Sequence, residues 1–265
     1  MSKNWYMLSL MLAISFIFAA RPWHSHSQTK PVAQAQAAAT NGGRKGLFTV
    51  VEGNVKKKQM TDEDWIRAQV KTDVIGGDRV RTLQQSRAEM NLAQLDLIRL
   101  APQTTIDIVK LYEETKEKKV QTKINLQSGD IWGKVKSVDA NSSFEVNSDF
   151  AGAAITGTVF RLSHDSTRQE TQLKVYTGEV RISNVPEKMG ALAPQTIQPA
   201  RVPGPTQVPG PTQISLEEWL YLVKSYQQIT IGANGKIKSV SSFRSSDRDE
   251  KSDWVKWNQQ RDRLR

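Results

Sequence analysis

The chain has 265 residues, of which 38% are hydrophobic and 24% charged, and these fractions exclude a multi-span membrane protein, a collagen and a wholly disordered chain. It contains no cysteine, which excludes disulfides, thiol catalysis, thiolate metal sites and the modified cysteine of a lipoprotein. The 37 Lys and Arg residues exceed the 27 Asp and Glu residues, and the formal net charge of +10 permits anionic partners without indicating a fold.

The N-terminus has the pattern of an export signal. A short polar head carrying Lys3 precedes the uncharged, apolar residues 5–20. A basic head and an apolar stretch of about 7–15 residues are typical of a secretory signal, whereas a membrane span needs about 20. We therefore expect residues 1–27 to be a signal peptide, or a signal anchor if the segment is retained. The remaining chain is expected to be periplasmic or otherwise extracytoplasmic, and attached to a membrane only if the segment is not cleaved.

The next 157 residues or so divide into a linker and a β region. Residues 28–45 are rich in Ala, Gln and Gly without a periodic apolar face, which predicts a flexible linker. In residues 46–184, apolar and polar residues alternate in short runs, as at Val120, Ile124 and Leu126. Alternation with period two over about 4–8 residues is typical of half-buried strands. About ten such segments fit, so we expect a mainly β domain.

Glycine-containing turns recur along this β region. Gly53, Gly129 and Gly178 are each followed by one polar residue and then an apolar one, and Gly77 is followed by two polar residues and then Val80. The four glycines are 24, 52 and 49 positions apart. Glycine supplies the positive φ that tight turns require. Intervals near multiples of about 25 indicate stacked repeats. We expect a jelly-roll-like sandwich or a short β-solenoid, with chance spacing of hairpin turns as the alternative.

Two segments interrupt the alternation. Residues 61–69 are expected to form a loop or a single helical turn that places Trp65 and Ile66 on the sheet. Residues 113–119 are highly charged and are expected to form the tip of a hairpin.

A spacer follows the β region. Residues 185–213 are rich in Pro and Gly and contain a perfect tandem of the hexapeptide VPGPTQ at 202–207 and 208–213. Proline favours an extended, semi-rigid chain, so this segment is expected to act as a spacer.

Residues 214–265 are expected to form a helix, a hairpin and a second helix. Ser215 and Glu218 have the spacing of a capping box, which predicts the start of the first helix. Apolar residues then follow at helical spacing: Trp219, Leu222, Val223 and Tyr226. The pair Asn234 and Gly235 between isoleucines predicts the hairpin turn.

The final helix, about 249–263, carries Trp254 and Trp257. These side chains could form a sugar-binding aromatic surface, but their helical spacing favours contact with the sheet. Together with Lys134 and Lys136 they are the candidate partner surface.

No catalytic, cofactor or metal site is expected. His24 and His26 have no nearby carboxylate, and His164 lies within a Ser-His-Asp-Ser run that is more typical of a turn than of a catalytic triad. The carboxylates of Asp78, Asp130 and Glu179 recur at glycine turns. Each turn offers one carboxylate, whereas Ca²⁺ needs several from one loop, so we expect these residues to stabilise turns.

Basic residues could form an anion-binding face: Lys56, Lys57, Lys58, Lys116, Lys118, Lys119, Lys134 and Lys136. Nucleic-acid readers interleave such residues with aromatic ones for base stacking. Here only Tyr112 and Trp132 lie close in sequence, so no nucleic-acid partner is expected. An envelope protein or an anionic cell-wall polymer is the expected partner class, although simple solubility also explains the charge.

An ordered series of motifs resembles the FecR domain family. It runs from GDRVRT and SRA through LAPQT, LQSG, FEV and AAITGTVF to YTGEV, and its motif residues are Gly77, Asp78, Thr82, Pro102, Thr104, Gly129, Gly157, Thr158 and Gly178. The chain departs from the family pattern at Asn147 and Ser148, which replace Thr-Pro, and at Thr156, which replaces an Arg. The C-terminal WVKWNQQRD resembles the tail of some exported members.

The resemblance implies an extracytoplasmic, non-enzymatic sensing or binding domain. The best-known members regulate iron-dicitrate uptake and carry a cytoplasmic anti-sigma segment before a membrane span. Only four residues precede the apolar run here, so we expect no sigma-factor binding. The expected function is an envelope binding, sensing or scaffold module that acts through protein–protein contacts. The alternatives are a glycan-binding or adhesin-like surface protein and, less favoured, an unrecognised hydrolase.

Overall fold

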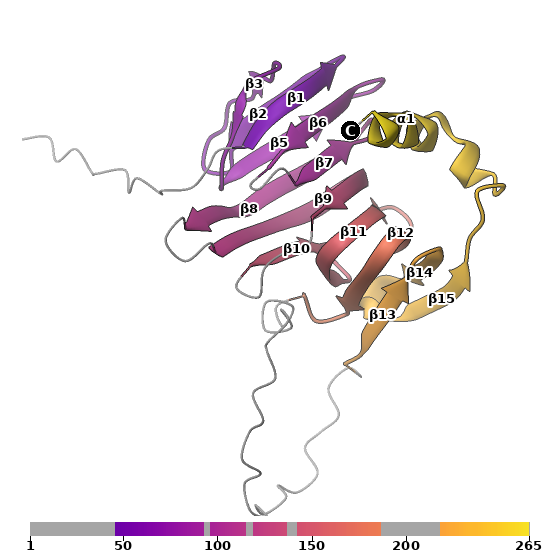
Figure 1. Ribbon diagram of the computed structural model, residues 1–265. Coiled ribbons are helices and arrows are strands. Elements are labelled where there is room, and N and C mark those ends of the chain that lie inside the picture. The colour runs from indigo at the N-terminus through magenta and orange to yellow at the C-terminus, as the bar shows by residue number, and fades with distance from the viewer. Residues whose placement is uncertain (1–45, 93–95, 115–118, 137–141, 187–217, 265) are drawn as a thin grey trace, which may run out of the picture. The chain divides into compact units, whose positions relative to one another are not determined.

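The computed structural model describes residues 46–92, 96–114, 119–136, 142–186 and 218–264, which belong to one compact unit, Asn41–Arg265. Their structure is mainly β, with a single α-helix near the C-terminus (Figure 1). The predicted mainly β fold is therefore confirmed. The signal segment, the first linker and nearly all of the Pro/Gly spacer lie outside the described residues. Among the residues that are described, no helix is both long and apolar enough to cross a membrane.

The strands of the described ranges form one open sheet of fifteen, against about ten expected. The first eight are β1 (Gly46–Glu52), β2 (Val55–Gln59), β3 (Ile66–Arg67), β4 (Asp73–Val74), β5 (Asp78–Thr82), β6 (Arg87–Asn91), β7 (Leu97–Leu100) and β8 (Thr105–Glu114). The others are β9 (Lys119–Val135), β10 (Ser143–Asn147), β11 (Gly152–Asp165), β12 (Glu170–Ser183), β13 (Leu220–Lys224), β14 (Gln227–Ile231) and β15 (Ile237–Ser242). The helical elements are η3 (Ala233–Gly235), η4 (Asp249–Lys251) and α1 (Asp253–Arg263).

The longest strands change partners where they bend. β9 pairs with β8 up to Ser128 and with β7 and β11 from Gly129 onward. β12 passes from β14 to β13 in the same way, on the two sides of Gly178. Gly129 and Gly178 have φ of +96° and +85°, values that favour glycine. We call such a bend a corner.

The prediction that glycines separate strands is therefore correct at two positions and wrong at two. Gly53 and Gly77 lie between strands, whereas Gly129 and Gly178 lie inside continuous ones. The strand continues through a corner, because each half of the strand pairs with its own neighbours.

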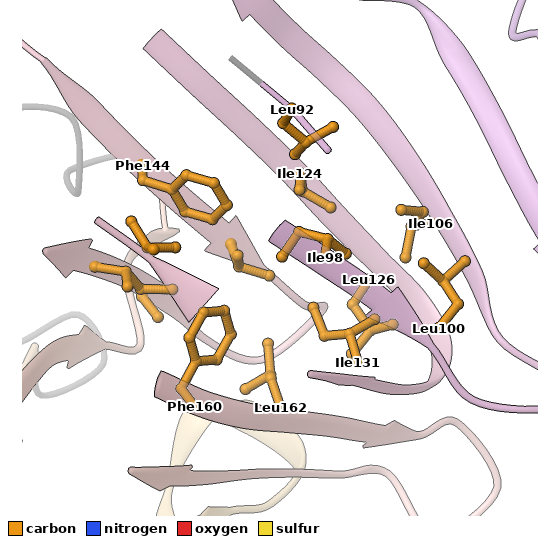
Figure 2. Close-up of a cluster of buried hydrophobic side chains, with 14 of the residues drawn as sticks. Leu92, Ile98, Leu100, Ile106, Ile124, Leu126, Ile131, Phe144, Phe160 and Leu162 are labelled. Carbon is orange, nitrogen blue, oxygen red and sulfur yellow. The ribbon is translucent and has the colours of Figure 1, made fainter. Parts of the chain in front are cut away.

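The core lies between the strand segments that the corners fold toward one another. Figure 2 shows Ile106, Ile124, Phe144, Phe160 and other apolar side chains of β7 to β11 pointing into a common interior. All of these side chains are buried. The alternate residues of the same strands face outward, and these outward positions carry the polar rows described below.

The predicted first C-terminal helix is wrong in its described part. Leu220–Lys224 is strand β13, which pairs with Glu179–Ser183 of β12, and Ser215 lies outside the described residues. Exposed Leu222 and buried Val223 match their partners on β12, exposed Arg181 and buried Val180. This pairing determines the structure of a segment too short to be a stable helix alone.

The other local predictions are mostly confirmed. β14 and β15 form the predicted hairpin around Asn234, whose φ is +60°. The final helix is present as η4 and α1, and the Ser252 side chain caps α1 by accepting a hydrogen bond from Val255 N. β8 and β9 form the predicted charged hairpin, whose tip, 115–118, lies outside the described residues. The prediction for residues 61–69 fails at Ile66, which lies in β3 and is 54% exposed.

Candidate functional site

A row of polar side chains crosses the outer face of five strands. Glu89 of β6 is opposite Arg99 of β7, which is opposite Trp132 of β9, then Arg161 of β11 and Lys174 of β12. Directly opposite residues on neighbouring antiparallel strands point to the same face of a sheet. We call these five residues the covered row, because the C-terminal segment lies over them.

Each cation of the covered row meets a carboxylate of the C-terminal segment. Asp262 Oδ1 is 2.8 Å from Arg99 Nη1, and Asp249 Oδ2 is 2.7 Å from Arg161 Nη1. Lys174 Nζ is 2.7 Å from the same Asp249 oxygen and 2.9 Å from Glu250 Oε1. Figure 1 shows the end of the chain returning to the β6–β7 side of the sheet through α1. Carboxylates of the segment thus form ion pairs with all three cations of the covered row.

Aromatic side chains fill the space between these ion pairs. Trp132 is buried and donates a hydrogen bond from Nε1 to Asp262 Oδ2 at 3.0 Å. Trp254 is only 7% exposed and donates to Asp130 Oδ1 at 3.2 Å. Trp257 is half-buried, stacks on Trp254 with ring centroids 5.5 Å apart and donates to Glu52 Oε1. The two tryptophans of α1 therefore contact the sheet, as their helical spacing favours.

These contacts alter the candidate partner surface. Trp254 is covered by the sheet and cannot belong to a free aromatic surface, because its indole already packs on Ala101 and Trp132. Lys134 is half-buried and Lys136 is exposed, both at the end of β9.

Burial and hydrogen bonding in and beside the covered row shift the pKa of Glu89 and that of Tyr176. Burial raises the pKa of Glu89, but hydrogen bonds from Arg261, Thr49 and Arg99 outweigh burial and lower that pKa to about 2. Glu89 is therefore ionised at every physiological pH. The pKa of Tyr176, whose hydroxyl donates to Glu250 at 2.9 Å, is raised by burial and by the charge of that carboxylate.

The motif residues of the first half of the series meet at one corner. Thr82 Oγ1 donates to Ala101 O at 2.6 Å and accepts from Thr104 N at 3.0 Å. Thr104 Oγ1 in turn accepts from Asp130 N at 3.0 Å, directly after Gly129. Half-buried Pro102 lies in the connection between β7 and β8, which carries Thr104 to this position.

The remaining motif residues occupy two further bends. Thr158 Oγ1 donates to Glu179 O at 3.1 Å, and a Cβ on Gly178 would lie 2.5 Å from Gly157 O. At the turn before β5, Gly77 has φ of +90°, and the fully buried Asp78 accepts hydrogen bonds from Lys57 Nζ at 2.8 Å and Ile75 N at 2.9 Å.

The three turn carboxylates have different surroundings. Asp78 is paired with Lys57, and Asp130 is paired with Arg161 at 2.6 Å, whereas Glu179 is exposed. The described part of the chain contains no group of three or more His, Asp or Glu residues arranged to hold a metal ion. Asp78 and Asp130 serve as acceptors for turn and strand donors.

His164 lies in a hydrogen-bonded chain that sequence reasoning missed. Its Nδ1 is 3.0 Å from Thr171 Oγ1, which is 2.9 Å from Ser148 Oγ, and its Nε2 is 3.4 Å from Asp149 Oδ2. His164, Thr171 and Ser148 are all buried, so no substrate can reach the hydroxyls in this arrangement. Asp165 accepts from Thr167 N and so caps the turn that follows β11. The chain of polar groups joins β11 and β12 to the loop after β10.

The motif residues of this β domain therefore lie at its corners and turns, where they hydrogen-bond to the backbone. Residues 78–181 match the model of the family described as "FecR protein". This stretch runs from β5 to β12 and spans the motif series from Asp78 onward, so the resemblance drawn from the motifs is confirmed.

Two solved structures are similar to the chain, both described as crystal structures of "a putative anti-sigma factor" from Parabacteroides distasonis ATCC 8503. They share 13% and 14% sequence identity with it at a TM-score of 0.42, and each alignment covers 62% of this chain. The chain spans 59% of the length of those chains. No curated protein matches the sequence.

Proposed function

We propose that the chain is an exported, non-enzymatic binding or sensing module of the bacterial envelope that acts through protein–protein contacts. The FecR match of residues 78–181 supports a regulatory or sensing class. The apolar N-terminal segment supports export. The hydrogen bonds of the motif residues to backbone groups at corners support a structural role for those residues over a catalytic one.

Strand β15 carries the protein-contact part of the proposal. β15 is an edge strand, and among the described residues it pairs with β14 alone. All six of its residues are exposed, including Ile237 at 39% and Val240 at 40%. An edge strand presents unpaired backbone donors and acceptors, which another extended segment can join by strand addition. Tyr226, at 60% exposed, extends the apolar surface beside this edge.

In-cell photo-crosslinking tests this function. A photoreactive amino acid at Val240 is expected to give a discrete protein adduct that mass spectrometry can identify. The same group at Lys256, an exposed position on α1, is the matched control and is expected to give none. An absence of adducts from Val240, or the same adducts from both positions, would contradict a protein contact through β15. Recovery of the chain in the cytosolic fraction would contradict export.

The glycan-binding alternative needs a surface other than the tryptophans of α1. The buried Trp254 and its hydrogen bond to Asp130 leave no flat indole pair free on that helix. Strands β2, β3 and β5, none of which contributes to the covered row, carry a surface with the chemistry for such a ligand.

A further inference from the structure

A second row of cations crosses three strands at the other end of the sheet. Lys56 of β2 is opposite Arg67 of β3 on one side and opposite Arg81 of β5 on the other. The register places the three side chains on the same outer face, and Lys56 is half-buried while both arginines are exposed. We call Arg67, Lys56 and Arg81 the open row.

None of these three cations has an ion pair with any residue that the structure describes. Arg67 reaches only the backbone oxygen of Gly53, at 3.5 Å, and Arg81 Nε donates to Thr105 Oγ1 at 3.3 Å. Asp107, two residues from Thr105 along β8, is already bound to Arg79, the residue opposite it on β5. The exposed acidic residues of the preceding loop, 62–64, form no ion pair with the row either. Like charges directly opposite one another destabilise a sheet, so this arrangement opposes folding.

The covered row shows how this protein pairs a line of cations with carboxylates. There, Arg99, Arg161 and Lys174 are each within 3 Å of a carboxylate from the C-terminal segment. The open row also places cations on one face across neighbouring strands, but it has no ion pair with a carboxylate of the described residues. Charge complementarity therefore points to an external anionic ligand.

The surroundings of the open row favour a sugar chain as the carrier of that charge. The half-buried ring of Trp65 lies 4.7 Å from Arg81 Cζ and 5.5 Å from Lys58 Nζ. On the other side, the row continues through Thr105 and Ser128. Together with Asn54, Gln84 and Gln103 these residues line a cavity of about 650 Å³. Uncharged hydroxyl and amide groups of this kind can donate to and accept from sugar hydroxyls.

We propose that the open row and its adjoining cavity bind an acidic oligosaccharide. The three cations hold its anionic groups, and the hydroxyls and amides of the cavity bind its sugar hydroxyls. The anionic group can be a carboxylate or a phosphate, since both suit a guanidinium. This site is independent of the proposed protein contact at β15, which lies on other strands.

Binding of defined probes to the purified chain tests the proposal by calorimetry. An oligogalacturonate supplies carboxylates on a sugar chain, and a phosphate-substituted oligosaccharide supplies phosphates on a sugar chain. The fully methyl-esterified oligogalacturonate supplies the sugar chain without charge, and polyphosphate supplies charge without sugar. We expect binding of one or both acidic oligosaccharides, and binding at least about tenfold weaker for the methyl ester and for polyphosphate. Equal binding of the methyl ester would refute the role of charge. Equal binding of polyphosphate would refute the role of the sugar, and failure of both acidic oligosaccharides to bind would refute the site.

Two sets of variants assign the binding to these residues. The triple change Lys56→Gln, Arg67→Gln and Arg81→Gln is expected to weaken acidic-oligosaccharide binding by about tenfold or more. The control triple, Lys224→Gln, Lys236→Gln and Lys251→Gln, removes the same charge from exposed positions elsewhere and is expected to leave affinity within about twofold. Equal losses in the two triples would contradict a local site.

The cavity variant Gln84→Ala with Gln103→Ala provides an independent readout. It should weaken oligosaccharide binding and leave polyphosphate binding unchanged. The absence of any loss in oligosaccharide binding would contradict the role of the cavity.

Discussion

The hydroxyl of Thr104 lies against the backbone at Gly129: it accepts a hydrogen bond from Asp130 N at 3.0 Å and donates to Asp130 O at 3.2 Å. A related contact occurs at the turn of Gly53, where Asn54 N donates to Ser86 Oγ at 2.8 Å. In each case a small hydroxyl residue of a neighbouring strand or connection stabilises the backbone next to a positive-φ glycine. Thr104 and Ser86, which are distant in sequence from these glycines, thus hold the backbone beside them.

Gly129→Ala is expected to destabilise the protein by about 1–3 kcal/mol or more, because a residue with a side chain is strained at φ of +96° and its Cβ would lie 2.6 Å from Thr104 Cα. The free energy of unfolding from urea titration measures the loss. Gly76→Ala is the control: its Cβ would meet no atom closer than 3.4 Å, so a change within about 0.5 kcal/mol is expected. Similar losses for both variants would contradict a special role for the corner.

Thr104→Val removes the hydroxyl while keeping the shape of the side chain. It leaves the amide of Asp130 without the acceptor it has now, and a lost partner for a buried polar group costs about 1–3 kcal/mol. Thr104→Ser keeps the hydroxyl and should retain most of that stability. A valine variant as stable as the serine variant in urea unfolding would show that the hydroxyl does not hold the corner.

Alternation of apolar and polar residues is sufficient to predict strands such as β9 and β12, because alternate residues are buried on either side of the corner in each strand. It also locates the positive-φ glycines. It cannot distinguish a turn from a corner, since both need glycine and a following polar residue. Residues 220–224 show a related limit: over five residues, helical and strand spacing of apolar side chains overlap, and pairing with β12 determines the outcome.

The covered and open rows could not be predicted because they depend on strand register. Arg99 and Arg161 are 62 residues apart in the chain, and they share a row only because both are opposite Trp132. The sequence pattern identified Trp254 and Asp130 separately, but not the hydrogen bond between them. A single sequence gives no measure of which outward-facing residues become neighbours.

Asp262→Ala is expected to loosen the C-terminal helix. The change removes the acceptor of Trp132 Nε1 and one carboxylate of the fully buried Arg99, and it should lower the free energy of unfolding by about 1–3 kcal/mol. The substitution should accelerate hydrogen exchange in α1 more than in β9, relative to the unaltered protein. Lys256→Ala, an exposed change on the same helix, should alter stability by less than about 0.5 kcal/mol. Equal exchange in the two variants would contradict the role of the carboxylate.

Glu89 is expected to make the protein acid-sensitive. Its pKa is about 2 in the folded chain against an ordinary value of 4.5, so its contribution to stability is complete above pH 4.5 and is lost as the pH falls toward 2. A shift of this size corresponds to roughly 3 kcal/mol. Buried Asp96, whose pKa is raised by burial to about 6, acts in the opposite direction between pH 4 and 6, so comparison of variants is needed. Glu89→Gln should flatten the stability profile below pH 4.5, while Glu179→Gln, at an exposed position, should leave the slope unchanged.

Lys56→Thr is expected to stabilise the protein, an unusual result for a point substitution. Lys56 lies between Arg67 and Arg81, and each pair of like charges directly opposite costs about 0.2–1 kcal/mol. Threonine relieves both repulsions and suits a strand, so Tm should rise by a few degrees at low salt. Because the gain is electrostatic, it should shrink in about 1 M salt, where charges are screened beyond about 3 Å. Lys224→Thr, which removes a cation opposite Glu179 on β12, should give no gain. A lower Tm for Lys56→Thr, or a gain that salt does not reduce, would mean that the open row is not a strained line of charge, and would remove the physical reason for an anionic ligand there.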